Sequence, residues 1–265
     1  MDIITAILLG IVEGLTEFLP VSSTGHLILA TELLGYDAAR WALFNIAIQP
    51  GAILAIVVLY WRTFMDVLRG LVRREQEAVA FTRNLLVAFF PAVVVGLAFA
   101  DNIDALLENA VVVAWALIIG GVAILLVERY ARPVETGGVA NVTLRQSVII
   151  GLVQCLAMVP GVSRSGATIL GAMGFGVDRK TAAEFSFFLA VPTLTGATVL
   201  QLYKHRDAIT PQALELIGIG FVVSFVVAYL VIKAFLAVVT RYGFAPFAWY
   251  RIVAGAAALI WLLNR

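Results

Sequence analysis

Long apolar runs, separated by short polar segments, dominate the chain. Six of them approach the roughly 20 residues that a helix needs to cross a bilayer. They are residues 41–60, 84–100, 111–127, 185–203, 216–238 and 246–263. Lys233 and Arg251 fall near the ends of the last two runs, where long side chains can snorkel toward the headgroups. The pattern predicts six transmembrane helices.

Two further apolar stretches are interrupted by polar residues. Residues 3–34 break around Pro20 and Gly25, and residues 147–176 break around Pro160 and Gly161. Each arm is too short to span a membrane comfortably, and proline ends a helix. Non-helical backbone at membrane depth persists only inside protein or along a polar cavity. We therefore expect two re-entrant helix–loop–helix hairpins.

The two halves of the chain resemble each other at a nearly constant offset. The landmarks that pair are Pro20 with Pro160, Phe44 with Phe185, Pro50 with Pro192, and Leu59-Tyr60 with Leu202-Tyr203. Three spans follow each hairpin, and this odd number makes the second copy upside down. The sequence thus predicts an all-α integral membrane protein, one membrane domain over residues 1–265, with inverted-topology repeats at about 1–130 and 141–265.

Composition and charge narrow the class of protein. Hydrophobic residues make up 62% of the chain and charged residues 13%, against about 25% charged in soluble domains. A water-soluble globule is excluded, and the net charge of +1 gives no reason to expect a nucleic-acid partner. Arginines in 61–83 and 128–145 place these loops in the cytoplasm, and the acidic loop 101–110 outside, whereas Lys204 and Arg206 run against this assignment.

Glu13 and Glu17 are four residues apart, so a helix would place both carboxylates on one face. Unpaired carboxylates are costly in hydrocarbon and need cations or protons. The pair could hold a divalent cation, Mg²⁺ or Ca²⁺, through oxygen ligands. The alternative is a structural pair neutralised by protonation or by Arg164.

The first break supplies Ser22, Ser23, Thr24, Gly25 and His26. Hydroxyls and free N–H groups at a helix start suit anionic oxygens. His26 could serve as a general acid, a general base or a nucleophile, although a lone buried histidine is more often structural.

The second break supplies Ser163, Arg164, Ser165, Gly166 and Thr168. An arginine fork matches phosphate oxygens two at a time, so Arg164 is expected to clamp an oxyanion. The alternative is that Arg164 only pairs with Glu13 or Glu17.

Acids, a hydroxyl, an imidazole and an arginine together suit metal-assisted phosphoryl transfer on a lipid-tailed diphosphate. The predicted catalytic residues are Glu13, Glu17, Ser23, His26 and Arg164, and the predicted diphosphate-binding residues are Ser22, Thr24, Ser163, Ser165, Gly166 and Thr168. The main rival is a transporter or flippase of a lipid phosphate, because such proteins also use inverted repeats with broken helices. An intramembrane serine protease would leave Arg164 unexplained. A non-catalytic membrane scaffold would give no reason for either the buried glutamates or the buried arginine.

The segments EGLTEFLPVSSTGH (13–26) and PGVSRSGAT (160–168) resemble the two signature motifs of the BacA-type undecaprenyl-diphosphate phosphatases. The resemblance covers the whole chain, including FSFFLAVPT (185–193), and departs at Pro50, where an aliphatic residue is expected. It implies hydrolysis of undecaprenyl diphosphate, which recycles the carrier lipid of peptidoglycan synthesis and confers bacitracin resistance. It also implies a multi-pass protein of the bacterial inner membrane, in contact with membrane lipids, with its active site facing the periplasm and outer leaflet.

Carried over by position, Glu13 and Glu17 are the acidic pair, Ser23 and His26 the catalytic hydroxyl and imidazole, and Arg164 the phosphate-binding arginine, with Ser163 and Thr168 beside it. The resemblance leaves open which of Ser23 and His26 attacks phosphorus. It also leaves the oligomeric state open, a homo-oligomer included.

Overall fold

The computed structural model describes residues 3–35, 38–99, 103, 106, 109–204, 206 and 210–264. Within these ranges the regular elements are helices, and the only β-type pairing is an isolated bridge between Val134 and Val177. The prediction of an all-α protein is confirmed.

Six long apolar helices match the six predicted spans in the described part of the chain. They are α3 (Ala38–Leu59), α5 (Gln76–Ala98), α7 (Ala110–Tyr130), α10 (Arg179–Lys204), α11 (Pro211–Tyr242) and α12 (Ala245–Leu263). Large apolar side chains on their outer faces, such as Phe90, Trp115 and Leu230, are more than half exposed. Apolar surface of this extent requires lipid around it, so the protein crosses the membrane several times.

The segment 61–83, predicted as a loop, is instead helical over most of its length. It forms α4 (Trp61–Val72), bent by 72° from the end of α3, and the first residues of α5. Trp61, Phe64 and Leu68 recur at the three- and four-residue spacing of one helix face. The prediction gave weight to the arginines of this segment and overlooked that spacing.

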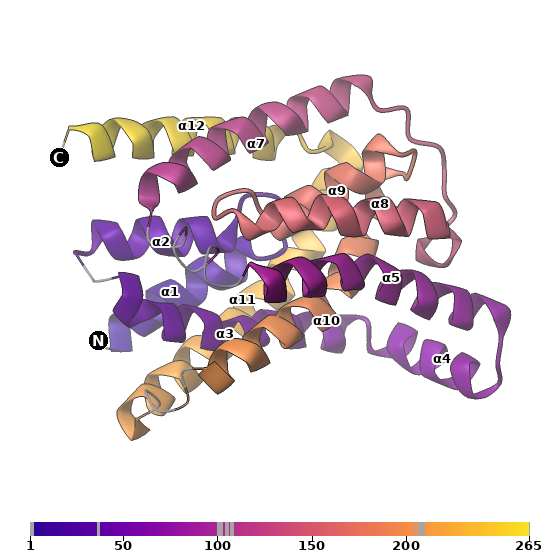
Figure 1. Cartoon of the computed structure of the whole chain (residues 1–265), viewed down its shortest axis with the longest axis horizontal. Helices are drawn as coiled ribbons and strands as arrows, with labels where there is room; N and C mark the ends of the chain where they lie inside the picture. The colour runs from indigo at the N-terminus through magenta and orange to yellow at the C-terminus, as the bar shows by residue number, and fades with distance from the viewer. Residues whose placement is uncertain are drawn as a thin grey trace.

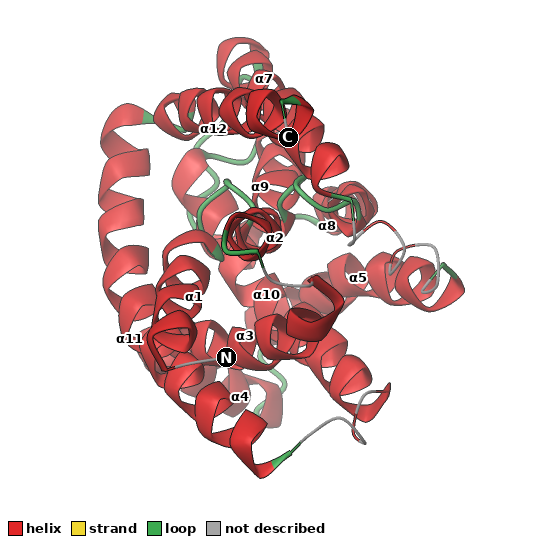
Figure 2. Cartoon of the chain, turned by 90° about the vertical axis from the view of Figure 1, so that its left-hand side faces the viewer, coloured by secondary structure: helices red, strands yellow, loops and turns green. Residues whose placement is uncertain are grey.

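Both predicted hairpins are present as pairs of short helices around a break. The first consists of α1 (Ile3–Thr16) and α2 (Ser23–Leu33). The second consists of α8 (Leu144–Gln154), the short 3₁₀ helix η2 (Cys155–Met158) and α9 (Arg164–Gly174), and it follows another 3₁₀ turn, η1 (Val139–Asn141). Figure 2 shows α2 near the middle of the molecule, with α11 at the left, α12 above it, and α5 and α8 at the right.

Close helix packing holds the hairpins inside the bundle. α12 lies along α7, and α11 lies along α1 and α3 (Figure 1). Glycine permits the shortest approach: a Cβ added at Gly14 would lie 2.7 Å from the carbonyl oxygen of Ser224 on α11, closer than real Cβ atoms come. These contacts fix the position of α1, and with it the start of the first break.

Two predictions about topology remain untested. The outside assignment of loop 101–110 depended on Asp101, Asn102, Asp104 and Glu108, which lie outside the described residues. The inverted relation of the two halves likewise stays a prediction, although the two breaks share a local geometry described below.

Candidate active site

The two breaks meet inside the molecule, although they are about 140 residues apart in the chain. Arg164, the first residue of α9, donates from Nη2 to Oε1 of Glu17 at 2.9 Å. Only 10% of the Arg164 side chain and 4% of the Glu17 side chain are exposed. The predicted encounter of an acid from the first hairpin with the guanidinium of the second is therefore present in the structure.

The other oxygen of Glu17 accepts a short hydrogen bond from the hydroxyl of Ser23, the first residue of α2. Arg164 is held in turn by Ser186 on α10, which accepts from Nη1 through its carbonyl oxygen at 2.9 Å and its hydroxyl at 3.2 Å. The guanidinium also lies over the ring of Phe18, 5.8 Å from its centroid. The Glu17 carboxylate thus orients both the Ser23 hydroxyl and the Arg164 guanidinium.

The same tight turn starts α2 and α9. Ser22 and Ser163, the residues before each helix, have φ values of 72° and 79°. Each serine hydroxyl accepts from a glycine amide three residues later, Gly25 at 3.2 Å and Gly166 at 3.0 Å. These side chains cap the helix starts, and both helices direct free N–H groups toward the breaks.

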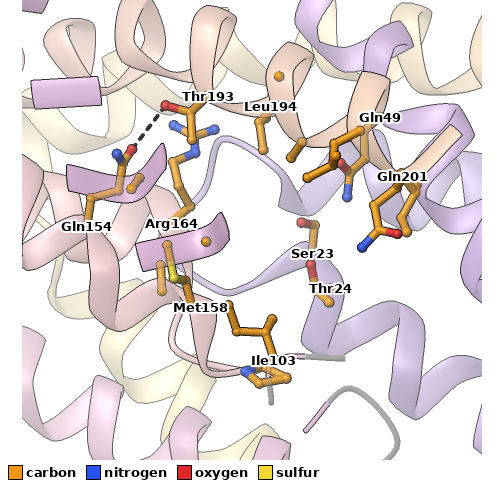
Figure 3. A pocket seen from close by; sticks show the side chains of 18 of the residues that line it. Ser23, Thr24, Gln49, Ile103, Gln154, Met158, Arg164, Thr193, Leu194 and Gln201 are labelled. Atoms are coloured by element: carbon orange, nitrogen blue, oxygen red, sulfur yellow. Dashed lines mark hydrogen bonds between the residues drawn. The ribbon is translucent and has the colours of Figure 1, made fainter. Parts of the chain in front are cut away.

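A cavity of about 480 Å³ opens above these two helix starts. Its polar end is formed by residues predicted from the sequence: Glu17, Ser22, Ser23, Thr24, Ser163 and Arg164. Figure 3 shows Arg164 on one side of the space and Ser23 with Thr24 on the other. The walls are largely apolar and come mainly from α5 and α10, including Phe89, Val93, Leu97, Leu194, Ala197 and Leu200. The cavity therefore joins a polar end, which carries the Arg164 cation, to a hydrophobic channel.

Several predicted site residues lie behind this surface instead of on it. Ser165 is fully buried and donates to the carbonyl oxygen of Leu19 at 2.8 Å, which ties the two breaks together. Thr168 pairs with the Ser186 hydroxyl at 2.7 Å. Neither of them, nor Gly166, is among the residues that line the cavity. In this structure they support Ser163 and Arg164 from below.

Glu13 is also behind the surface, one turn before Glu17 on α1 and with no exposed area. Neither of its carboxylate oxygens has a hydrogen-bond partner among the described residues. No group of three or more His, Cys, Asp or Glu side chains is arranged for a metal in the described ranges. Two carboxylates completed by substrate phosphates are nevertheless a usual Mg²⁺ arrangement, and the unpartnered oxygens of Glu13 fit it.

His26 contacts α12 and is turned away from the cavity lining. Its Nδ1 is 2.7 Å from the carbonyl oxygen of Ser22, and its Nε2 is 2.8 Å from the hydroxyl of Tyr250 on α12. The two rings are stacked, with centroids 5.6 Å apart. Both ring nitrogens are thus engaged by the protein, and His26 is not among the cavity-lining residues.

The position of Arg251 near the end of a span had suggested that its side chain snorkels toward the headgroups. In the structure it turns into the protein instead. It is 1% exposed, and its N–H groups donate to five main-chain carbonyl oxygens. The acceptors are those of Pro20, Gly161, Val162, Ala116 and Leu117, at 2.8 to 3.3 Å. The carbonyls of Pro20, Gly161 and Val162 lie in the two breaks, outside the helices, whereas those of Ala116 and Leu117 lie within α7. The interior therefore supplies Arg251 with acceptors from both breaks and from the neighbouring helix. Lys233, by contrast, is exposed and contacts the Tyr229 hydroxyl at 3.1 Å.

Comparison with known proteins places these features in one family. A family profile described as bacitracin resistance protein BacA matches residues 6–257. The chain belongs to the BacA family. It is 62% identical to an undecaprenyl-diphosphatase of Novosphingobium aromaticivorans over 99% of both chains. It is 57% identical to the protein of the same name from Sphingopyxis alaskensis over 98% of both chains, and 52% identical to that of Pseudomonas syringae pv. tomato over 98% of this chain and 95% of the relative.

Sequence reasoning on this BacA-family chain missed the supporting residues that lie outside the motifs. Tyr250 and Arg251 occur in an apolar span with no local pattern to mark them. Gln49, Gln154 and Thr193 also line the cavity, and Thr193 donates to Gln154 at 3.4 Å (Figure 3). An amide inside an apolar run is itself a signal, because a membrane-embedded polar side chain needs a partner. That signal would have found the two glutamines.

Proposed function

We propose that this protein is an integral-membrane phosphatase that hydrolyses undecaprenyl diphosphate to undecaprenyl phosphate and inorganic phosphate. The names of its relatives supply the substrate, and one observation in this chain supports the activity. Glu17 holds the Ser23 hydroxyl and the Arg164 guanidinium together at the polar end of a cavity with apolar walls. A diphosphate on a lipid tail has this same division between a charged end and an apolar end.

Ser23 is the proposed nucleophile, because its hydroxyl faces both the cavity and a carboxylate. Glu17 takes the hydroxyl proton while the Ser23 oxygen bonds to the terminal phosphorus. The bond from that phosphorus to the bridging oxygen breaks, and its electron pair leaves with the lipid monophosphate. Water then attacks the phosphoserine, which releases inorganic phosphate and returns the proton to Ser23.

Arg164 is proposed to bind the terminal phosphate throughout this sequence. Its Nε–H is buried and has no partner among the described residues, so one donor of the guanidinium remains unused. Free N–H groups at the starts of α2 and α9 add further donors to the phosphate oxygens. Fixed donors of this kind stabilise charge that develops in the transition state.

Glu13 and Glu17 are proposed to hold a divalent cation, Mg²⁺ or Ca²⁺, when substrate is bound. Such an ion would neutralise diphosphate charge and favour departure of the lipid phosphate. The contribution of this chain is the pair of carboxylates one helical turn apart, of which Glu13 makes no competing hydrogen bond with the described residues.

The wider role follows from the same substrate. We place the enzyme in the bacterial inner membrane, with its cavity open toward the periplasm and outer leaflet, where it recycles the carrier lipid of peptidoglycan synthesis. Raised turnover of the diphosphate would then confer bacitracin resistance.

The test is phosphate release by the purified protein in detergent, with undecaprenyl diphosphate as substrate and Ser23→Ala as control. We expect release by the parent in Mg²⁺, strong inhibition by EDTA, and background rates for the variant. No release by the parent at any divalent-ion concentration would refute the proposal and favour a lipid-phosphate transporter. Release by Ser23→Ala at the parent rate would show that Ser23 is not the nucleophile.

A further inference from the structure

The contacts of His26 determine where its proton lies. A carbonyl oxygen only accepts hydrogen bonds, so Nδ1, at 2.7 Å from the Ser22 oxygen, carries the hydrogen. In the neutral ring Nε2 is then the acceptor, and the Tyr250 hydroxyl donates to it at 2.8 Å. Tyr250 and Ser22 together select one tautomer and leave no lone pair free for the substrate.

The Ser22 carbonyl is part of the peptide that precedes Ser23. It accepts from the backbone N–H of His26 at 3.1 Å and from the ring at 2.7 Å, so it points along α2. In a trans peptide the N–H lies opposite the C=O. The Ser23 N–H therefore points out of the start of α2, toward the cavity that Ser23 lines. The two hydrogen bonds to the Ser22 oxygen therefore fix the direction of the Ser23 N–H.

The second break provides an internal comparison. Ser163 has nearly the same φ as Ser22, caps Gly166 in the same way, and its carbonyl oxygen accepts from the Ala167 amide at 2.9 Å. Ala167 occupies the position that corresponds to His26, so that turn forms without any imidazole. The His26 ring is therefore not required to make the turn. It is an addition to the break that carries the reactive hydroxyl.

We propose that Tyr250 is a positioning residue which, through His26, holds the Ser22–Ser23 peptide so that the Ser23 amide and hydroxyl address the substrate phosphate. This inference rests on the proposed phosphatase function. In this arrangement His26 makes no contact with the substrate phosphorus, and its ring acts only as a hydrogen-bond donor to the Ser22 carbonyl.

The discriminating variant is His26→Asn. Asparagine has an amide nitrogen bonded to Cγ, as Nδ1 is, and so keeps a donor for the Ser22 carbonyl while it removes every basic ring nitrogen. We expect His26→Asn to retain kcat within about tenfold of the parent, and His26→Ala to lose about 100-fold or more. If the two variants are equally inactive while both remain folded, His26 acts directly on the substrate and the proposal is wrong.

Tyr250→Phe tests the hydroxyl while it preserves the stacked ring. We expect kcat to fall about five- to tenfold, the effect of one net hydrogen bond, with KM within about twofold of the parent. The double variant Tyr250→Phe/His26→Asn should have the same kcat as His26→Asn alone, because Tyr250 acts only through the His26 ring. Tyr242→Phe is the matched control, because that tyrosine is 58% exposed and its hydroxyl has no hydrogen bond among the described residues. A parent-like kcat for Tyr250→Phe would overturn the role of Tyr250.

A spectroscopic measurement separates this inference from the proposed function. The chain has two histidines, so ¹⁵N-labelled histidine in a His205→Gln background reports on His26 alone. We expect the proton on Nδ1 in the parent, and exchange between protonation states in Tyr250→Phe. A proton on Nε2 in the parent would overturn the inference whether or not the protein releases phosphate. Absence of phosphate release together with an Nδ1 proton would refute the phosphatase function and, because the inference rests on it, the catalytic role assigned to the peptide.

Discussion

Replacing Arg164 by alanine should separate catalysis from folding at this site. The guanidinium makes a charge-assisted bond to Glu17 at 2.9 Å and two bonds to Ser186, and it is nine-tenths buried. Loss of one preorganised donor to a developing oxyanion lowers kcat by about 10²- to 10³-fold. Loss of one partner of a buried ion pair also destabilises a protein by about 3–5 kcal/mol. We expect both effects in Arg164→Ala.

The double variant Glu17→Gln/Arg164→Gln distinguishes the two effects. It removes both charges of the ion pair together, so its melting temperature in detergent should recover toward that of the parent while kcat remains at background. Arg164→Lys keeps a point charge without the fork, and its kcat should lie between those of the parent and the alanine variant. Phosphate release is measured at saturating lipid, with melting followed by intrinsic fluorescence. Arg164→Ala with kcat above a tenth of the parent value would refute the phosphate clamp.

Three further outcomes follow from contacts at or near the site. Glu13→Gln should raise the Mg²⁺ concentration for half-maximal phosphate release by about tenfold or more, because one of two carboxylate ligands is lost; an unchanged Mg²⁺ titration would exclude Glu13 as a ligand. Gly120→Ala would place a methyl group 2.0 Å from Nη2 of Arg251, and overpacking of this kind costs about 1–3 kcal/mol, so its melting temperature should fall. Gly218→Ala, where nothing lies within 4 Å, should melt at or above the parent temperature, because alanine favours a helix over glycine. Burial raises the pKa of Asp178, but hydrogen bonds from Thr181 and Thr136 outweigh burial and hold that pKa below its usual value. The stabilisation by Asp178 is therefore present above the unfolded pKa of about 3.9 and is lost as the pH falls through the lower folded pKa. Asp178→Asn should melt below the parent at pH 7 and together with it at about pH 2; a difference that persists at low pH would contradict this account.

The contact between the two breaks was predictable because the local sequence around each of its residues is unusual. Charged and hydroxylated residues beside proline and glycine, inside apolar runs, have few physical explanations other than a shared polar site. Glu17, Ser23 and Arg164 were found in this way, and the structure brings them together. The roles assigned to these residues in the reaction stay predictions until the variants are measured.

The supporting contacts were not predictable because they depend on tertiary packing. Nothing near Arg251 in the sequence indicates that α12 lies against α7 and both breaks, so a surface position was the reasonable expectation. The same holds for Tyr250, which reaches His26 across 224 residues of chain. Ser165 and Thr168 illustrate the converse, because their motif suggested substrate contacts. In the fold the Ser165 hydroxyl joins the two breaks, and the Thr168 hydroxyl pairs with Ser186 on α10.

The hydrophobic channel between α5 and α10 has a consequence for turnover. Substrate and lipid product have the same tail, so contacts with Phe89, Val93 and Leu200 attract both molecules equally. Such affinity concentrates the enzyme's ligands without accelerating the reaction, and it makes the product a competitor for the vacated site. Discrimination between the two depends on a single phosphate group at the polar end. A longer or tighter channel would slow exchange of one lipid for the next.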